Sequence, residues 1–200
     1  MTRTTKAILA MITIAAVSAL GTAIMVLNRG FSAKAEPLAI ETFVARHVRR
    51  LAIPAYARSA ANPMPATTEV VTDGMRHFAD HCALCHANDG SGDTDHGRNM
   101  YPRPADLRLP PTQSLSDGEL FYVIENGIRF TGMPAFATGT EEGARDTWML
   151  VRFMRHLPKL TPEELAEMRS LNPKSPEEFR QEEEIRRFLE GGDSREKPPR

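Results

Sequence analysis

Two cysteines and a histidine stand together in one short run, Cys82-Ala83-Leu84-Cys85-His86, and the 200-residue chain has no other cysteine. On a helical turn, two thiols three positions apart can reach the two vinyl groups at one edge of a porphyrin. The residue that follows then presents an imidazole nitrogen to the iron. The run is the attachment signature of haem c, and it predicts one haem held covalently at Cys82 and Cys85 with His86 as an axial ligand.

Other uses of the two thiols fit the sequence less well. A structural zinc site needs four ligands, commonly as two spaced pairs, and His77 or His81 would have to complete a set taken from a single segment. A dithiol redox motif expects a strand–helix setting, which the sequence does not indicate. A buried pair of unreactive cysteines is the remaining alternative.

The far side of the ring needs a second axial ligand. Met133 lies in Thr131-Gly132-Met133-Pro134, where Gly132 permits close approach of the backbone and Pro134 stiffens the loop. We therefore predict Met133 as the sixth ligand, with His96, Met100 or an open position as alternatives. A further group of possible metal ligands in the preceding loop is interpreted as turn caps rather than as a metal cluster. Its members are Asp89, Asp93, Asp95 and His96.

Helical spacing of apolar residues and capping patterns account for the elements that must position these groups. No segment shows sustained alternation of polar and apolar residues, so the sequence predicts an all-α fold without a sheet. Helices are expected over 38–53, from about 66 to the cysteines, over 116–127, over about 144–156, and from Thr161 and Ser175 onward. Trp148, Val151, and Met154 or Leu157 are expected to be buried, and Met149 and Met154 are interpreted as core residues.

Two segments between these helices show no period. Residues 54–65 contain three prolines and read as a linker or a strap along the surface. Residues 88–113 form a stretch rich in glycine and proline. A loop of that length is unusual in a compact domain unless it has a function, and wrapping a large flat cofactor is such a function.

The N-terminus carries an uncharged apolar run, Ala7 to Leu27, after a short basic start. At about 1.5 Å per residue this run just spans a hydrocarbon core of roughly 30 Å. A cleaved signal peptide is the alternative, since Ala33-Lys34-Ala35 would serve as a small-x-small cleavage site. The length of the run and the position of Arg29 favour an uncleaved anchor, and both interpretations export the rest of the chain.

The helix expected over 38–53 is amphipathic, with Arg46, Arg49 and Arg50 beside its apolar positions. It could lie on lipid headgroups or pack on its own domain, and the sequence favours neither. The composition is otherwise that of an ordinary globular protein, with 41% apolar residues and a net charge of −1. Disorder, several membrane spans and nucleic-acid binding are not indicated.

Together these features resemble the monohaem class I cytochrome c family over about residues 66–160. The resemblance rests on the Cys82–His86 run, on Gly132-Met133-Pro134, and on helix signatures in the expected order. Gly74 and Phe78 resemble the N-terminal helix of that family, and Leu150-Val151-Arg152-Phe153-Met154 resembles the C-terminal helix that it crosses. Pro104 and Leu107 resemble the loop that supports the proximal histidine.

The resemblance implies an all-α, cytochrome c-type helical bundle around one covalent haem c. The resemblance gives the cytochrome c domain at 66–160. The sequence departs from the small soluble members of the family by an anchor or signal segment at 1–35, an amphipathic linker at 36–65 and a C-terminal helical extension at 161–200. The implied function is single-electron transfer on the periplasmic side of a bacterial-type inner membrane, without substrate turnover. Membrane-bound respiratory complexes are the expected donor and acceptor. A haem-containing ligand sensor or a peroxidase-like enzyme subunit is the alternative.

Overall fold

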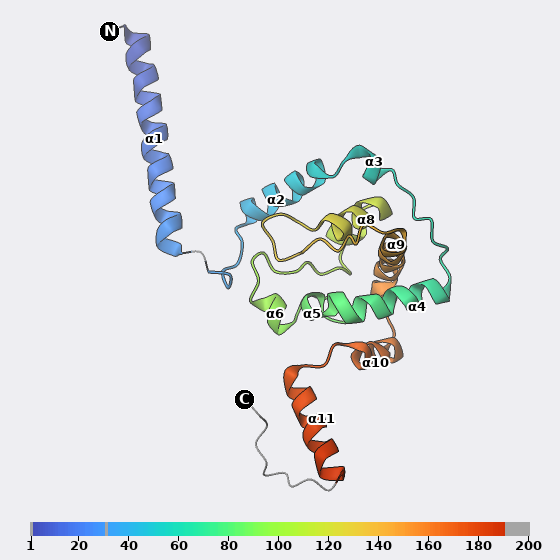
Figure 1. Ribbon diagram of the computed structural model, residues 1–200. Helices are drawn as coiled ribbons and strands as arrows, with labels where there is room; N and C mark the ends of the chain where they lie inside the picture. Colours follow the sequence, from blue (N-terminus) through green and yellow to red (C-terminus); the bar gives the residue numbers. More distant parts are fainter. Residues whose placement is uncertain (1, 31, 191–200) are drawn as a thin grey trace.

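The computed structural model describes residues 2–30 and 32–190, and all regular structure in them is helical (Figure 1). The expected all-α class is thus confirmed for the described residues. The helices are α1 Arg3–Arg29, α2 Ala39–Ala52, α3 Ala55–Arg58, α4 Thr68–His77, α5 Ala83–His86, α6 Asp95–Arg98, α7 Pro110–Gln113, α8 Asp117–Asn126, α9 Glu141–His156, α10 Pro162–Leu171 and α11 Pro176–Leu189.

The crossing of α4 and α9 organises the centre of the molecule. Gly74 stands at the closest point, where a Cβ atom would lie only 2.2 Å from the carbonyl oxygen of Met149. One turn further along, the rings of Phe78 and Phe153 pack with their centroids 5.1 Å apart, and both are fully buried. The absence of a side chain at Gly74 therefore lets the two helix backbones touch and brings the two rings together. This is the helix crossing that the family resemblance implies.

The buried core extends from this crossing to α8 and α10. Leu120 and Ile124 contribute from α8, and Met168 contributes from α10, where it is completely buried. Ser116 and Glu119 form the predicted capping box at the start of α8, and Gly127, at φ +65°, ends that helix as expected. These caps satisfy backbone groups that a helix end would otherwise leave without partners.

Several details differ from the sequence-based expectation. Short helices α3, α6 and α7 occur inside segments that were expected to lack regular structure, because runs of four residues are too short to show a period. Helix α9 begins three residues earlier than expected, since Thr140 caps it by accepting the Gly143 N–H. Trp148 is half-buried and stacks on Phe121 at 4.1 Å, whereas Val151, Met154 and Leu157 are buried as predicted.

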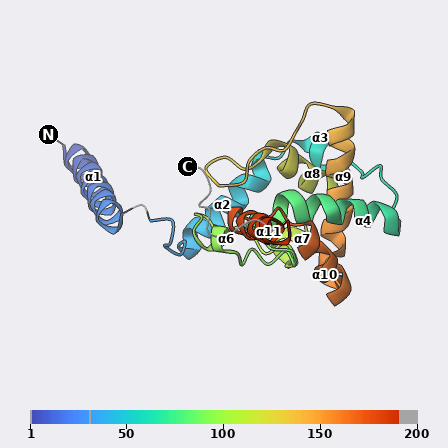
Figure 2. The same ribbon diagram turned by 60° about the horizontal axis from the view of Figure 1, so that its bottom comes forward.

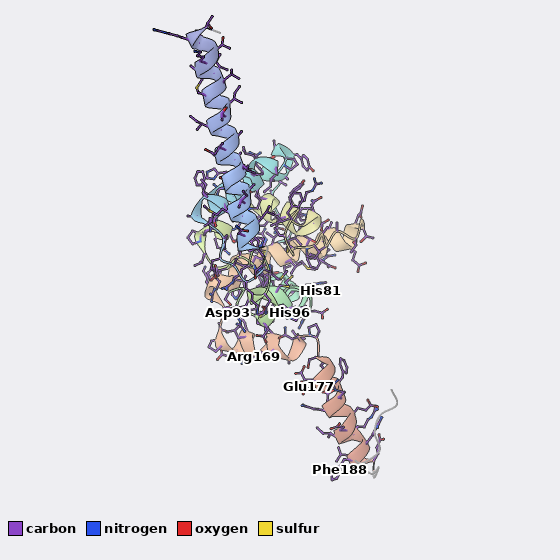
Figure 3. All side chains as sticks on the ribbon, turned by 90° about the vertical axis from the view of Figure 1, so that its left-hand side faces the viewer. His81, Asp93, His96, Arg169, Glu177 and Phe188 are labelled. Carbon is purple, nitrogen blue, oxygen red and sulfur yellow. The ribbon has the colours of Figure 1, made fainter. Side chains whose placement is uncertain are left out.

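The C-terminal helices begin as predicted, with capping boxes at Thr161–Glu164 and Ser175–Glu178. Helix α10 packs under α4, and α11 follows it (Figures 1 and 2). In Figure 3, Phe188 near the end of α11 lies well away from the domain, and 70% of its surface is exposed. The polar tail expected from Gly191 lies outside the described residues.

The N-terminal elements stand outside the core. Helix α1 is long and apolar enough to cross a membrane, and none of its apolar window is buried in the protein. Helix α2 occupies nearly the range that was expected and contains no buried residue. Helix α3 instead packs on α8, where a Cβ atom at Gly118 would lie 1.9 Å from the Ala57 carbonyl oxygen.

Candidate functional site

The Cys–x–x–Cys–His run begins at the end of a wider helical turn that follows α4. A π-helical turn, Phe78–Cys82, follows α4 and leads directly into α5, which ends at His86. Such turns occur often at functional sites, because they change the phase of the side chains that follow. Cys82 and Cys85 form no disulfide with each other, and both are partly exposed. Burial, and secondly the neighbouring Cys85, raises the pKa of Cys82 to about 12, so the thiol is protonated at neutral pH.

The imidazole of His86 is fixed by the loop that was expected to support it. Its Nδ1 lies 3.3 Å from the carbonyl oxygen of Ala105. Because a carbonyl oxygen only accepts, Nδ1 donates the hydrogen bond, and the lone pair is left on Nε2. Burial lowers the pKa of His86, which favours this neutral form. A neutral imidazole held through its other nitrogen is the usual arrangement for a metal-ligating histidine.

The loop from 88 to 113 is tied closely to this segment. The Gly92 N–H donates to the His86 carbonyl oxygen at 2.8 Å, and the Leu107 N–H donates to the Gly90 carbonyl oxygen at 2.8 Å. Gly97 also passes close by, since a Cβ atom there would lie 2.9 Å from the Cys85 carbonyl oxygen. The loop is therefore packed against the Cys–His run.

The acidic residues of this loop act within the loop. Asp89 caps a turn by accepting the Ser91 N–H at 3.0 Å and also pairs with Arg108 at 2.8 Å. Asp93 and Asp95 both pair with Arg98. Among the described residues there is no group of three or more His, Cys, Asp or Glu that could hold a metal ion. Asp89 therefore caps a turn as interpreted, whereas Asp93 and Asp95 form ion pairs with Arg98.

Met133 lies in a loop that folds back on the end of α8. Its carbonyl oxygen accepts the Ile128 N–H at 3.1 Å, and its own N–H donates to Thr131 Oγ1 at 3.1 Å. Gly127 is packed so tightly beneath this loop that a Cβ atom would lie 2.7 Å from the Met133 carbonyl oxygen. The backbone of Met133 is thus held on both sides, while its side chain is partly exposed. This geometry suits a residue that must present a sulfur at a defined place.

The structure brings Met100 to the same loop. A Cβ atom at Gly132 would lie 1.8 Å from the terminal methyl of Met100. The Met100 side chain therefore occupies the space that a side chain at position 132 would need. Met100 is an alternative ligand on sequence grounds, but its contact with Gly132 joins two separate loops and has no local signal in the sequence. His96, by contrast, is exposed on α6 (Figure 3).

A pair of asparagines that the sequence analysis did not single out ties both flanks of the Cys–His run to α10. Asn172, directly after α10, donates from Nδ2 to the Ala79 carbonyl oxygen at 2.8 Å and to Asn88 Oδ1 at 3.0 Å. Asn88 donates back from its own Nδ2 to Asn172 Oδ1 at 2.7 Å. Ala79 precedes Cys82, and Asn88 follows His86. No local pattern could have shown this, because the partners are 84 and 93 residues apart.

The donors fit haem c by their chemistry. Two free thiols stand three positions apart, followed by an imidazole whose Nε2 is available, and a thioether stands on a fixed loop. The Nε atom of Arg49 is buried and has no hydrogen-bond partner in the described part of the chain. Burial, and secondly Arg46 and Arg50, lowers the pKa of Arg49. An anionic group such as a haem carboxylate would accept a hydrogen bond from Arg49 Nε and would stabilise the charged guanidinium.

Comparison with protein families agrees with this chemistry. Residues 69–154 match the family model described as cytochrome C oxidase, cbb3-type, subunit III. No curated protein matches the chain. Among solved structures, a chain of the Kuenenia stuttgartiensis reducing HAO-like protein complex Kustc0457/Kustc0458 is similar at 21% identity and a TM-score of 0.41. That likeness covers 48% of this chain and 46% of the other.

The matched range contains both cysteines, His86 and Met133, and it leaves out α1, α2, α3, α10 and α11. On this sequence match, residues 69–154 form a c-type cytochrome domain.

Proposed function

We propose that the chain binds one haem c, covalently through Cys82 and Cys85, and transfers single electrons between redox partners. When bound, haem supplies reversible one-electron chemistry at its iron. The observation that carries the proposal is the position of His86, at the end of the Cys–x–x–Cys–His run, with Nδ1 fixed by Ala105 and Nε2 available. Cys82 and Cys85 would hold the group through their sulfur atoms, and His86 would supply an imidazole nitrogen to its iron.

Met133 is proposed as the second axial ligand. Its backbone is held by Ile128 and Thr131, so the thioether can keep one place in both oxidation states. A ligand pair that does not rearrange favours fast electron exchange and leaves no open position for a substrate. A neutral, soft thioether also favours ferrous iron and hence a comparatively high reduction potential. Electron transfer is therefore preferred over a ligand sensor or a peroxidase-like subunit, which would need an exchangeable position.

The membrane location is also a proposal. Helix α1 is suited by length and composition to span a bilayer, although a signal sequence would pass the same test. We propose that α1 is an uncleaved anchor and that the domain lies on the periplasmic side of the inner membrane. Membrane-bound redox proteins would then meet it at a raised effective concentration. The matched family is described as a subunit of an oxidase, which supports a respiratory partner or a place within such a complex.

Covalent attachment is tested first. The protein, matured with its haem, is denatured and extracted with acidified acetone, and the remaining colour is assayed by haem stain in a gel. Colour that stays with the chain supports thioether bonds, and colour that leaves with the solvent refutes them. Replacement of both Cys82 and Cys85 by serine should abolish the stain, whereas the control Ser170→Ala, at an exposed position of α10, should keep it.

The ligand assignment is tested by exchanging each methionine separately. Met133→Ala should open the sixth position, lower the reduction potential and let the ferrous protein bind carbon monoxide rapidly. Met100→Leu keeps the bulk next to Gly132 and should leave the wild-type spectrum and slow carbon monoxide binding intact. Rapid binding by the wild type would promote the sensor or enzyme alternative. The reverse pattern between the two variants would make Met100 the ligand.

The anchor is tested by cell fractionation and N-terminal sequencing. An uncleaved α1 predicts a membrane fraction that resists alkaline carbonate. A soluble protein beginning at Glu36 would show that the site at Ala33–Ala35 is cleaved.

A further inference from the structure

Helix α2 turns its apolar side away from the protein. Thr42 and Arg49 are the partly buried residues of this helix, and at about 100° per residue they point in nearly the same direction. Ile53, directly after the helix, is buried. The large apolar side chains occupy the opposite half of the helix and are between 49% and 77% exposed. They are Ile40, Phe43, Val44, Val48 and Leu51.

This arrangement reverses that of an ordinary surface helix, which buries its apolar side on its own domain. The sequence left two interpretations of this helix open, and the exposure of its apolar residues counts against packing on the domain. Apart from His47, whose ring packs on Phe43 with the centroids 4.0 Å apart, this exposed strip is apolar. Such a strip in a folded protein usually marks a surface that a membrane or another molecule covers.

The polar half of α2 holds the domain instead. Glu41 accepts a hydrogen bond from the Tyr101 hydroxyl, and Arg50 donates to Ser114 Oγ at 3.3 Å. Just before the helix, Glu36 pairs with Arg103 at 2.9 Å. These partners belong to the segment 101–114, which also contains the Ala105 carbonyl that orients His86. Helix α2 is therefore fastened, through its polar side, to the loop that supports the haem ligand.

The chain itself indicates what covers the apolar side. Segment 30–38 separates the end of α1 from the start of α2, and fully extended it reaches about 30 Å. If α1 spans a bilayer, α2 cannot be much further than this from the bilayer surface. Arg46 is exposed beside the apolar strip, as expected of a helix that lies close to anionic lipid headgroups.

We propose that α2 lies in the headgroup layer of an anionic membrane, with Phe43, Val44 and Val48 inserted, and fixes the orientation of the haem domain. The inference rests on the proposed anchor. In this arrangement the haem domain cannot reorient freely relative to the membrane, because one side of α2 lies in lipid and the other side is bonded to the loop 101–114.

The test uses the full-length haem protein in vesicles of phosphatidylcholine with phosphatidylglycerol. The thioether bonds consume both native cysteines, so an introduced cysteine can carry a nitroxide label alone. Labels at Val44→Cys and Val48→Cys should collide severalfold more often with oxygen, which dissolves in lipid, than with a water-soluble nickel chelate. The control Ser170→Cys, exposed on α10, should show the aqueous ratio.

An aqueous ratio at Val44 and Val48 overturns the proposal. Protection from both reagents also overturns it and indicates a second copy or another protein on the strip. Val48→Asn provides a check that depends little on folding, because this side chain is largely exposed: it should make a label at Val44→Cys more accessible to the chelate.

Resistance to alkaline carbonate, measured separately, reports whether α1 anchors the protein. If α1 proves to be cleaved, the mature soluble protein is floated with the same vesicles. Flotation that Val48→Asn abolishes keeps the α2 proposal while the anchor fails, and absence of flotation refutes both.

Discussion

Removal of the Asn172 side chain tests whether the C-terminal helix α10 is part of the haem-binding unit. In Asn172→Ala three hydrogen bonds disappear: the one to the Ala79 carbonyl oxygen and the two exchanged with Asn88. Each contributes about 1 kcal/mol net. The site is half-buried, so water can replace part of this, and we expect the free energy of unfolding to fall by about 2 kcal/mol. That is roughly a 30-fold larger unfolding constant.

The assay is guanidinium unfolding of the ferric haem protein, followed by circular dichroism and by the visible absorption of the haem. A double-mutant cycle with Asn88→Ala should show a coupling of about 1–2 kcal/mol, because the two amides bond each other directly. Ser170→Ala is the matched control, since its hydroxyl bonds only the Glu167 carbonyl oxygen in its own helix.

A loss below about 0.5 kcal/mol in Asn172→Ala, or strict additivity with Asn88→Ala, would refute the reasoning. The amide pair would then be a surface contact, and α10 would be dispensable for the stability of the Cys–His run.

Three further changes test the fold and the loop. Gly74→Ala places a Cβ atom 2.2 Å from the Met149 carbonyl oxygen, so the backbones of α4 and α9 must separate. The free energy of unfolding should therefore fall by at least about 2 kcal/mol. A neutral effect would contradict the close contact of α4 and α9 at Gly74. Ala87 has φ +60° and ψ 160°, a region that favours glycine, so Ala87→Gly should raise stability by about 1 kcal/mol, measured as a higher denaturant midpoint. The Arg108 guanidinium holds the pKa of Asp106 below its usual value. The ionised Asp106 therefore stabilises the protein above the ordinary carboxyl pKa, and this contribution should fade as pH falls below about 4. The difference between wild type and Asp106→Asn in thermal unfolding should shrink over that pH range, and a difference that persists into strong acid would disprove the assignment.

The haem-binding motif and most helices could be predicted from sequence because their causes are local. The thiols and imidazole of Cys82, Cys85 and His86 are close in the chain, and their spacing alone carries the chemistry. Capping boxes such as Ser116–Glu119 lie within one turn, so their positions followed directly from residue types. The all-α class followed from a period that spans ten or more residues, and the structure confirms it for the described part.

Tertiary structure decided what depends on distant partners. No local pattern distinguishes Asn172 from other asparagines, yet it meets Ala79 across 93 residues. The contact between Met100 and Gly132 likewise requires two loops to fold together. Helix α2 is the clearest case. Its amphipathic pattern was evident in the sequence, but a pattern defines only two sides, and which side faces the protein is set by the tertiary contacts of Glu41 and Arg50.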